Sequence, residues 1–294
     1  MLKRRLADAL VTTLNACAQL PGRRFYRYYL EYLNRRFNDF GETTEAEIGE
    51  RHIRFACPNL LTRWRVETLR SKEPAALDWI DGFSCEDTLW DVGANIGIYS
   101  IYAAVSRGCR VVAFEPSPVN FALLERNIVL NDLSEKIVAF PVALCESQRI
   151  DLLNMANMDA GGAFATFGGR SPQASVRIAC LGYPLDDFVD KFAPPFPQHL
   201  KIDVDGNEDM ILHGAGRTLA DHRLRSVSIE LDDRRPEQGA MIQETFKQLG
   251  FRKTAHSGRR CLPIPPRRIS TSSALRPKPR ELRSARPRKA PPIT

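Results

Sequence analysis

The sequence predicts an α/β protein built on a mostly parallel β-sheet with helices on both faces. Between residues 85 and 251, short apolar segments alternate with segments of helical periodicity, a pattern typical of βαβ units. The 294 residues are 43% hydrophobic, which is enough for a large core. No apolar run approaches the roughly 20 residues of a membrane-spanning helix, so an integral membrane protein is excluded.

The predicted elements follow one another in a regular order. Strands are expected at Thr88–Val92, Val111–Glu115, Ile137–Val142, Leu200–Val204 and Ser226–Leu231. The first strand is followed by a helix whose apolar positions are Ile98, Ile101, Tyr102 and Val105. A second helix spans Pro118–Leu130, since proline suits a first turn, where its missing N–H costs nothing. One more helix is expected from Ile211 to Leu219, and a last one ends at Gly250.

The two flanks of this region differ from it in composition. Residues 1–84 predict a helical N-terminal extension and lead-in, with a leucine at every fourth position from Leu2 to Leu14. Residues 252–294 hold 13 Lys/Arg, eight prolines and one acidic side chain, which predicts a basic, Pro-rich disordered tail. The net charge of +7 belongs to this tail, because the preceding 251 residues carry 29 basic and 34 acidic side chains.

Residues 145–175 interrupt the strand–helix rhythm. They contain four glycines, Gly161, Gly162, Gly168 and Gly169, and few periodic apolar positions. Ligands of open α/β sheets bind beyond the carboxyl ends of the strands, which is where this segment begins. It is therefore predicted to be a substrate lid, with a plain surface loop as the alternative.

The seven cysteines are scattered, and none forms a Cys-x-x-Cys pair. This pattern excludes a disulfide scaffold and a cysteine-based zinc site. It is typical of a protein of the reducing cytoplasm, where we expect this one.

A first candidate site lies where the first strand turns into the first helix, at Asp91-Val92-Gly93-Ala94-Asn95-Ile96-Gly97. Gly93 permits a tight turn and the close approach of a ligand, and Gly97 permits close packing at the start of the helix. A dinucleotide pyrophosphate would need a GxGxxG loop, whereas this loop is GxxxG with a carboxylate, Asp91, directed towards it. The loop therefore favours S-adenosylmethionine, which has a cationic amino group and no phosphate, over NAD.

Glu115 adds to this site. It ends the second strand, where an acidic residue can accept both hydroxyls of a ribose. A strand-end carboxylate that merely bonds neighbouring backbone is the alternative.

A second candidate site lies on the fourth strand. Alternation places Leu200, Ile202 and Val204 on one face and the ionisable Lys201, Asp203 and Asp205 on the other. Three such groups on one face of a central strand are costly to bury unless they are paired or used in chemistry. Glu230, at the end of the fifth strand, is expected to point into the same region. A simple Lys201–Asp203 ion pair is the alternative.

These segments resemble the FkbM family of S-adenosylmethionine-dependent methyltransferases. The resemblance lies in DVGANIGIYS (Asp91–Ser100), VVAFEPSPVNFALLERNIVLN (Val111–Asn131) and LKIDVDGNEDMILHGA (Leu200–Ala215), and it covers residues 85–250. It implies a Rossmann-like class I methyltransferase fold and methyl transfer to a hydroxyl oxygen, often of a sugar or polyketide.

The resemblance also implies roles for single residues. Asp91, Gly93, Asn95 and Gly97 would line the methionine part of the cofactor, Glu115 would hold the ribose, and Ala143 would lie near the adenine. Lys201, Asp203, Asp205 and Glu208 would sit in the acceptor region. Two features depart from the family: Asp205 stands where Glu is usual, and Arg/Pro-rich sequence follows Phe251 where two further strands are usual, which predicts an exposed sheet edge.

We therefore expect a methyltransferase domain at residues 85–251 that uses S-adenosylmethionine to methylate a hydroxyl of a carbohydrate or glycosylated metabolite. The catalytic candidates are Lys201, Asp203, Asp205 and Glu230, with Asp205 as a metal-free general base. Magnesium held by Asp203, Asp205 and Glu230 is the alternative, disfavoured because Lys201 would repel it.

Three other functions stay open. A nucleotide-dependent dehydrogenase is disfavoured by the missing GxGxxG. An RNA methyltransferase would have to bind through the tail, because the preceding residues are net acidic, so we expect no nucleic-acid partner. An inactive cofactor-binding domain is the third.

Overall fold

The computed structural model describes residues 43–163, 165–169, 174–231 and 235–252, together with Thr12, Tyr28 and Glu31. The predicted helix through Leu2 and Leu14 and the predicted tail after Arg252 concern residues outside these ranges. None of the helices within the ranges is long and apolar enough to cross a membrane.

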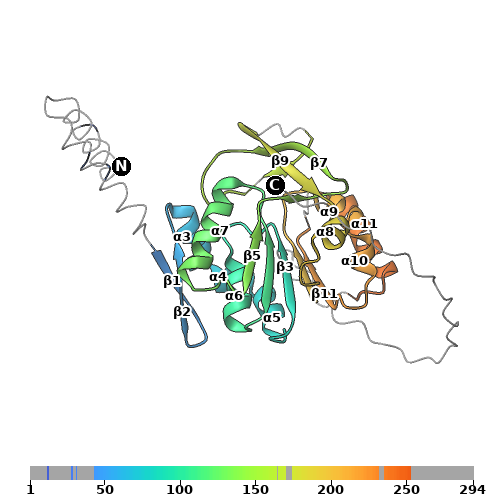
Figure 1. Cartoon of the computed structure of the whole chain (residues 1–294), viewed down its shortest axis with the longest axis horizontal. Coiled ribbons are helices and arrows are strands. Elements are labelled where there is room, and N and C mark those ends of the chain that lie inside the picture. Colours follow the sequence, from blue (N-terminus) through green and yellow to red (C-terminus); the bar gives the residue numbers. More distant parts are fainter. Residues whose placement is uncertain are drawn as a thin grey trace, which may run out of the picture.

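The centre of the molecule is a five-stranded sheet in which all neighbouring strands are parallel (Figure 1). Its order is β11 (Ser226–Ile229), β10 (His199–Ile202), β3 (Thr88–Val92), β4 (Arg110–Phe114) and β5 (Ile137–Phe140). The predicted α/β class and all five predicted strands are confirmed, although several end one or two residues early. Among the described residues, β11 pairs only with β10.

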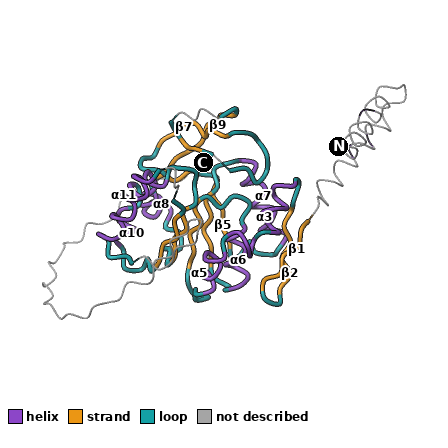
Figure 2. Tube along the Cα trace, turned by 180° about the vertical axis from the view of Figure 1, so that it is seen from behind, coloured by secondary structure: helices purple, strands orange, loops and turns teal. Residues whose placement is uncertain are grey.

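Helices cover both faces of this sheet, as predicted (Figure 2). Leu89 packs in the core on one face and its neighbour Trp90 in the core on the other, because side chains alternate along a strand. The first face carries α3 (Leu60–Glu67), α4 (Leu69–Lys72), α5 (Pro74–Asp81), α6 (Ile98–Ser106) and α7 (Pro118–Leu130). The second carries α8 (Leu185–Phe192), α9 (Glu208–His213), α10 (Gly216–Ala220) and α11 (Pro236–Gln248).

The single helix predicted from Ile211 to Leu219 is two helices, α9 and α10. Gly214, which ends α9, packs so closely that a Cβ there would lie 2.1 Å from the carbonyl oxygen of Cys145. A new helix then begins because the Asp186 carboxylate accepts the backbone N–H groups of Arg217 and Thr218 at 2.7 and 2.8 Å. A long-range contact thus interrupts a locally helical pattern.

The helical lead-in predicted for residues 1–84 is wrong between residues 43 and 56. There β1 (Thr43–Ile48) and β2 (Arg51–Ala56) form an antiparallel hairpin. Ile53 and Phe55 are buried while Arg54 is exposed, which is the two-residue period of a strand. The hairpin docks on α7, where the Asn127 side chain accepts the backbone N–H of Ala56 at 2.8 Å.

Residues 145–175, predicted to be a loop, contain strands in their described part. A second sheet has the order β6 (Ala143–Leu144), β9 (Val176–Tyr183), β7 (Arg149–Met155), β8 (Thr166–Phe167), and its long β7–β9 pair is antiparallel. It has a small apolar core of its own that includes Leu153, Phe167 and Cys180. Figure 1 shows β7 and β9 across one end of the central sheet.

Candidate active site

The site is built around the turn that follows β3. The backbone N–H groups of Gly93 and Ala94 donate to the carbonyl of Phe114 on the adjacent strand, at 2.9 and 3.0 Å. Gly93 has φ +81°, and a Cβ there would lie 2.0 Å from the backbone oxygen of Asp203. Only glycine fits this position, and the turn consequently lies directly against the end of β10.

Glu115, which directly follows β4, holds the same turn in place through hydrogen bonds. One carboxylate oxygen accepts the backbone N–H of Asn95 at 2.7 Å, and the other accepts that of Ser117 at 2.8 Å. Burial raises the pKa of Glu115 to about 7, although these hydrogen bonds oppose the shift. The structure therefore brings together Gly93, Asn95 and Glu115, three of the predicted cofactor residues.

The sequence predicted that the Asp91 carboxylate is directed towards the loop after β3. In the structure it lies behind that turn instead. Its side chain is fully buried, and one oxygen accepts the Ser100 hydroxyl at 2.6 Å. The other oxygen has no hydrogen-bond partner and lies 3.7 Å from Nζ of Lys201. Burial raises the pKa of Asp91 against the effect of Lys201. Asp91 is in the interior of β3, so its carboxylate contacts α6 and β10 instead of a ligand.

Lys201 links Asp91 to the ligand side of the sheet. Its ammonium lies 2.7 Å from the Asp203 carboxylate and 4.7 Å from the centroid of the Tyr99 ring. Burial alone would lower the pKa of Lys201, but the carboxylates of Asp203 and Asp91 outweigh burial and raise it. The ammonium in turn holds the pKa of Asp203 below its usual range, against the effect of burial. Lys201 is therefore charged and paired.

Glu230 is the protonated partner of Asp203. A hydrogen bond to Asp203, together with burial, raises the pKa of Glu230 to about 9. Its backbone N–H continues the β11–β10 pairing by donating to Ile202 at 3.0 Å. The expectation that Glu230 points into the region of Asp203 is confirmed.

Asp205 and Glu208 belong to the turn after β10. The strand ends at Ile202, so the alternation that places Lys201 and Asp203 on one face does not extend to Asp205. The Asp205 carboxylate accepts the backbone N–H of Ala165 at 3.2 Å. Glu208 is buried, accepts the N–H of Gly206 at 3.2 Å, and has its pKa raised by burial to about 7. Across the described ranges, no group of three or more His, Cys, Asp or Glu side chains is arranged to hold a metal ion.

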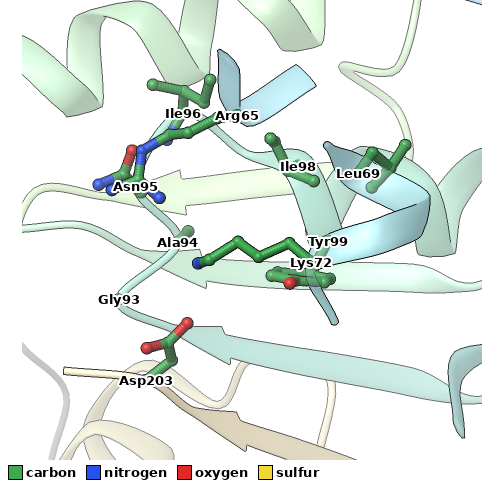
Figure 3. A pocket seen from close by; sticks show the side chains of 10 residues that line it. All are labelled: Arg65, Leu69, Lys72, Gly93, Ala94, Asn95, Ile96, Ile98, Tyr99 and Asp203. Carbon is green, nitrogen blue, oxygen red and sulfur yellow. The ribbon is translucent and has the colours of Figure 1, made fainter. Parts of the chain in front are cut away.

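A pocket opens between this turn and the helices of the lead-in (Figure 3). The empty space between its walls is about 450 Å³, including space open to solvent. Its lining residues are Arg65, Leu69, Lys72, Gly93, Ala94, Asn95, Ile96, Ile98, Tyr99 and Asp203. Arg65 and Lys72 were not predicted as site residues. Their seven-residue spacing, about two helical turns, would place both on one side of a continuous helix, but they lie in two helices, α3 and α4.

A segment of the predicted lid, residues 160–162, crosses the turn beside this pocket. Asn95 donates its side-chain amide to the carbonyl of Gly162 at 2.8 Å, and Asn120 accepts the N–H of Gly161 at 2.8 Å. Arg65 donates to the carbonyl of Gly161 at 2.7 Å. Ala143 lies in β6 within the core of the second sheet and does not line the pocket. Motion of this segment stays a prediction.

The family described as "Methyltransferase FkbM domain" matches residues 91–253, which is more than half of the chain. The chain belongs to this family. It is therefore a methyltransferase, and membership implies a methyl donor of the S-adenosylmethionine type. The match begins at Asp91, so α3, α4 and α5 lie outside it.

Two curated relatives are similar to part of the chain. A hexuronic acid methyltransferase, AglP, from Haloferax volcanii is 26% identical over 174 residues, which are 59% of this chain and 69% of that protein. The 31-O-demethyl-FK506 methyltransferase FkbM from Streptomyces tacrolimicus is 29% identical over 160 residues, 51% of this chain and 57% of that protein. The solved structure of precorrin-6y C5,15-methyltransferase from Geobacter metallireducens has a TM-score of 0.40 at 13% identity, covering 68% of this chain and 86% of that one. The family assignment does not depend on this structural likeness.

Proposed function

We propose that this FkbM-family enzyme transfers the methyl group of S-adenosylmethionine to a hydroxyl oxygen of a carbohydrate or glycosylated metabolite. The observation that carries the proposal is the pocket on the Gly93–Asn95 turn, which has Asp203 at its floor and Glu115 behind it. The names of the two curated relatives support the acceptor class, since one acts on a hexuronic acid and the other is named for an O-demethyl substrate.

The residues of the turn fit the cofactor. Each oxygen of Glu115 accepts one backbone N–H, and a carboxylate oxygen has capacity for a second donor. Ribose hydroxyls would supply those donors. Gly93 lets the turn lie against the end of β10, and Gly97 lets the start of α6 pack against Leu124 of α7. Gly93 and Asn95 both line the pocket. Adenine would then lie beyond Glu115, towards the segment after β5 that ends at Ala143.

The bound cofactor would supply an electrophilic methyl group on a sulfonium sulfur. The chain's own residues must then hold the acceptor in line and take the hydroxyl proton. Asp203 is a poor base because Lys201 lowers its pKa, and Glu230, with a pKa of about 9, already carries its proton at neutral pH. Asp205 is therefore our candidate general base, with Lys201 balancing the charge of the site.

We favour a metal-free reaction. The ammonium of Lys201 is already within 2.7 Å of Asp203, and it would repel a divalent cation held by the same carboxylate. Asp205 is held by Ala165, on the side of the second sheet, instead of converging with Asp203 and Glu230. The acceptor is a small molecule or saccharide, and the place of the reaction is the cytoplasm, as the cysteine pattern favours.

The test is the identity of the bound cofactor, followed by turnover. Mass spectrometry of purified protein soaked with equal amounts of S-adenosylhomocysteine and NAD should show retention of the first alone. Incubation with isotopically methyl-labelled S-adenosylmethionine and a panel of saccharides should label a sugar oxygen. Retention of NAD would overturn the proposed cofactor, and label found only in RNA would overturn the acceptor class.

A further inference from the structure

Two cations from outside the family-matched region line the pocket. Arg65 comes from α3 and Lys72 from the end of α4, and both face the Gly93–Asn95 turn (Figure 3). Asp203 lines the same pocket and carries the opposite charge. Neither the sequence pattern nor the resemblance gives Arg65 and Lys72 a role.

We infer that Lys72, with Arg65 beside it, binds the α-carboxylate of the cofactor's methionyl group. The inference rests on the proposed function, because it assigns one end of the proposed cofactor. It adds a binding residue from α4 to a site otherwise built from the turn and the sheet.

An ion pair with Glu73 holds the Lys72 ammonium in position and leaves some of its N–H donors available for a ligand. Its ammonium lies 2.8 Å from one carboxylate oxygen of Glu73, whose other oxygen accepts the Tyr99 hydroxyl at 2.7 Å. The Lys72 side chain is 42% exposed, whereas that of Glu73 is only 8% exposed. An ammonium has three N–H donors, so the ion pair with Glu73 still leaves donors for a ligand. Figure 3 shows the side chain extending across the pocket towards Ala94.

Arg65 supplies a second positive charge next to Asn95 (Figure 3). Its Nε–H donates to the carbonyl of Gly161 at 2.7 Å, which sets the orientation of the guanidinium. Guanidinium groups carry further N–H donors on their two terminal nitrogens, and their planar shape matches a carboxylate. Arg65 thus both anchors residues 160–162 and adds to the positive potential of the pocket.

The charges of the pocket match an amino acid rather than a simple anion. A zwitterionic methionyl group has an ammonium and a carboxylate on one carbon atom. Asp203, whose side chain is 28% exposed, is the complement of the ammonium, and Lys72 is the complement of the carboxylate. Glu115, the ribose candidate, accepts the backbone N–H of Asn95 and does not line the pocket, whereas Lys72 does, so we assign the amino-acid end of the cofactor to the side of Lys72.

The experiment compares two ligands that differ only by this group. S-adenosylhomocysteine has the amino-acid end, and 5′-methylthioadenosine lacks it. By calorimetry, Lys72→Gln should weaken binding of S-adenosylhomocysteine at least about tenfold, the scale of a charge-assisted hydrogen bond, and leave 5′-methylthioadenosine unaffected. Lys72→Arg should retain most of the affinity. Arg70→Gln removes an equal charge from the same helix outside the pocket and should change neither affinity.

The other outcomes are distinct. An equal loss for both ligands, or no loss for either, would overturn the carboxylate assignment. Unchanged binding of both ligands with a raised KM for an acidic saccharide would assign the cations to the acceptor's carboxylate instead. Failure of the unmodified protein to bind either ligand would overturn the proposed function, and the carboxylate assignment, which rests on it, would fall with it.

Discussion

Lys201 and Asp91 face each other directly across the β10–β3 pair, buried on the same side of the central sheet beneath α6. The two strands are parallel and in register, so a cation on one strand and a carboxylate on the next are held at 3.7 Å with little freedom to separate. Because Lys201 also contacts Asp203, one buried ammonium serves two carboxylates. The charge of the candidate site is therefore set from inside the sheet.

Removing this ammonium should destabilise the fold. Lys201→Met leaves Asp91 and Asp203 without a counter-charge, and breaking a buried pair in this way costs about 3–5 kcal/mol of the free energy of unfolding. Urea denaturation would measure the loss. The double variant Asp91→Asn/Lys201→Met should recover part of it, because one uncompensated carboxylate is gone. Equal stability of the double and single variants would mean that the two side chains are not coupled.

Cofactor affinity should depend on Glu115. Glu115→Ala removes a carboxylate that holds the turn and is proposed to accept the ribose hydroxyls. We expect binding of S-adenosylhomocysteine to weaken by about 1–3 kcal/mol in calorimetry, the scale of a lost charge-assisted hydrogen bond. Asp91→Ala should weaken binding to a similar extent, but indirectly, through the position of Lys201. Glu125→Ala on α7 is the control, because it removes a carboxylate that is not part of the candidate site, and it should leave the affinity unchanged. Wild-type affinity in Glu115→Ala would contradict the assignment of Glu115 to the ribose.

A buried hydrogen-bond chain at the opposite end of the sheet should make stability depend on pH. Trp79 donates to the Ser226 hydroxyl at 2.8 Å, Ser226 lies 2.7 Å from Nδ1 of His199, and Nε2 of His199 lies 3.0 Å from Asp87. Since the Asp87 carboxylate can only accept, the neutral His199 donates from Nε2, and its Nδ1 accepts the proton of the Ser226 hydroxyl. Although Ser226, His199 and Asp87 are the residue types of a hydrolase triad, all three are buried, so we assign them a structural role.

Burial lowers the pKa of His199 from 6.5 to about 4, against the effect of Asp87. As the pH falls, His199 therefore takes up a proton near pH 6.5 in the unfolded chain but only near pH 4 in the folded chain. Stability from this group is present above pH 6.5 and is lost as pH falls, by up to about 3 kcal/mol. Chemical denaturation at a series of pH values should show that the difference in unfolding free energy between the wild type and His199→Gln changes by this amount between pH 6.5 and 4, because the raised pKa values of Glu115 and Glu208 affect both proteins alike. The exposed His222→Gln should keep the wild-type slope, and an unchanged slope in His199→Gln would contradict the assignment.

Local patterns were sufficient to predict the central sheet. The apolar run Thr88–Val92 and the helix Pro118–Leu130 were predicted to the residue, because each is defined by its own periodicity and by a proline or glycine at its end. The β1–β2 hairpin and the β7–β9 pair were not predicted. Their strands bury one face only and depend on partners elsewhere in the chain, such as Asn127 for Ala56.

The candidate site, like the fold, was predicted from the sequence only in part. The sequence placed Gly93, Asn95 and Glu115 correctly at one turn, since parallel strands bring their carboxyl ends together. It did not show that Asp91 faces Lys201 instead of a ligand, because alternation says which residues share a face and not what covers that face. Lys72 was missed for a related reason: its place in the pocket depends on a long-range arrangement that brings α4 beside the Gly93–Asn95 turn.

Activation of the acceptor hydroxyl should depend on Asp205. A sugar hydroxyl is a poor nucleophile at neutral pH, so its proton must be taken by a base or its pKa lowered by a cation. With Asp203 paired to Lys201 and Glu230 protonated, Asp205→Asn should lower the rate of methyl transfer at least about a hundredfold and leave affinity for S-adenosylhomocysteine intact. Wild-type turnover in this variant would remove Asp205 from the mechanism.

Chelation separates the base from the metal in the same assay. Under the general-base mechanism, excess EDTA leaves the rate unchanged, because the ammonium of Lys201 already neutralises Asp203, one of the three carboxylates that a magnesium ion would need. Activity that is lost with EDTA and restored by magnesium would establish the cation route instead. In that case Asp203→Asn should impair metal-dependent turnover as strongly as Asp205→Asn, since both carboxylates would have to serve as ligands.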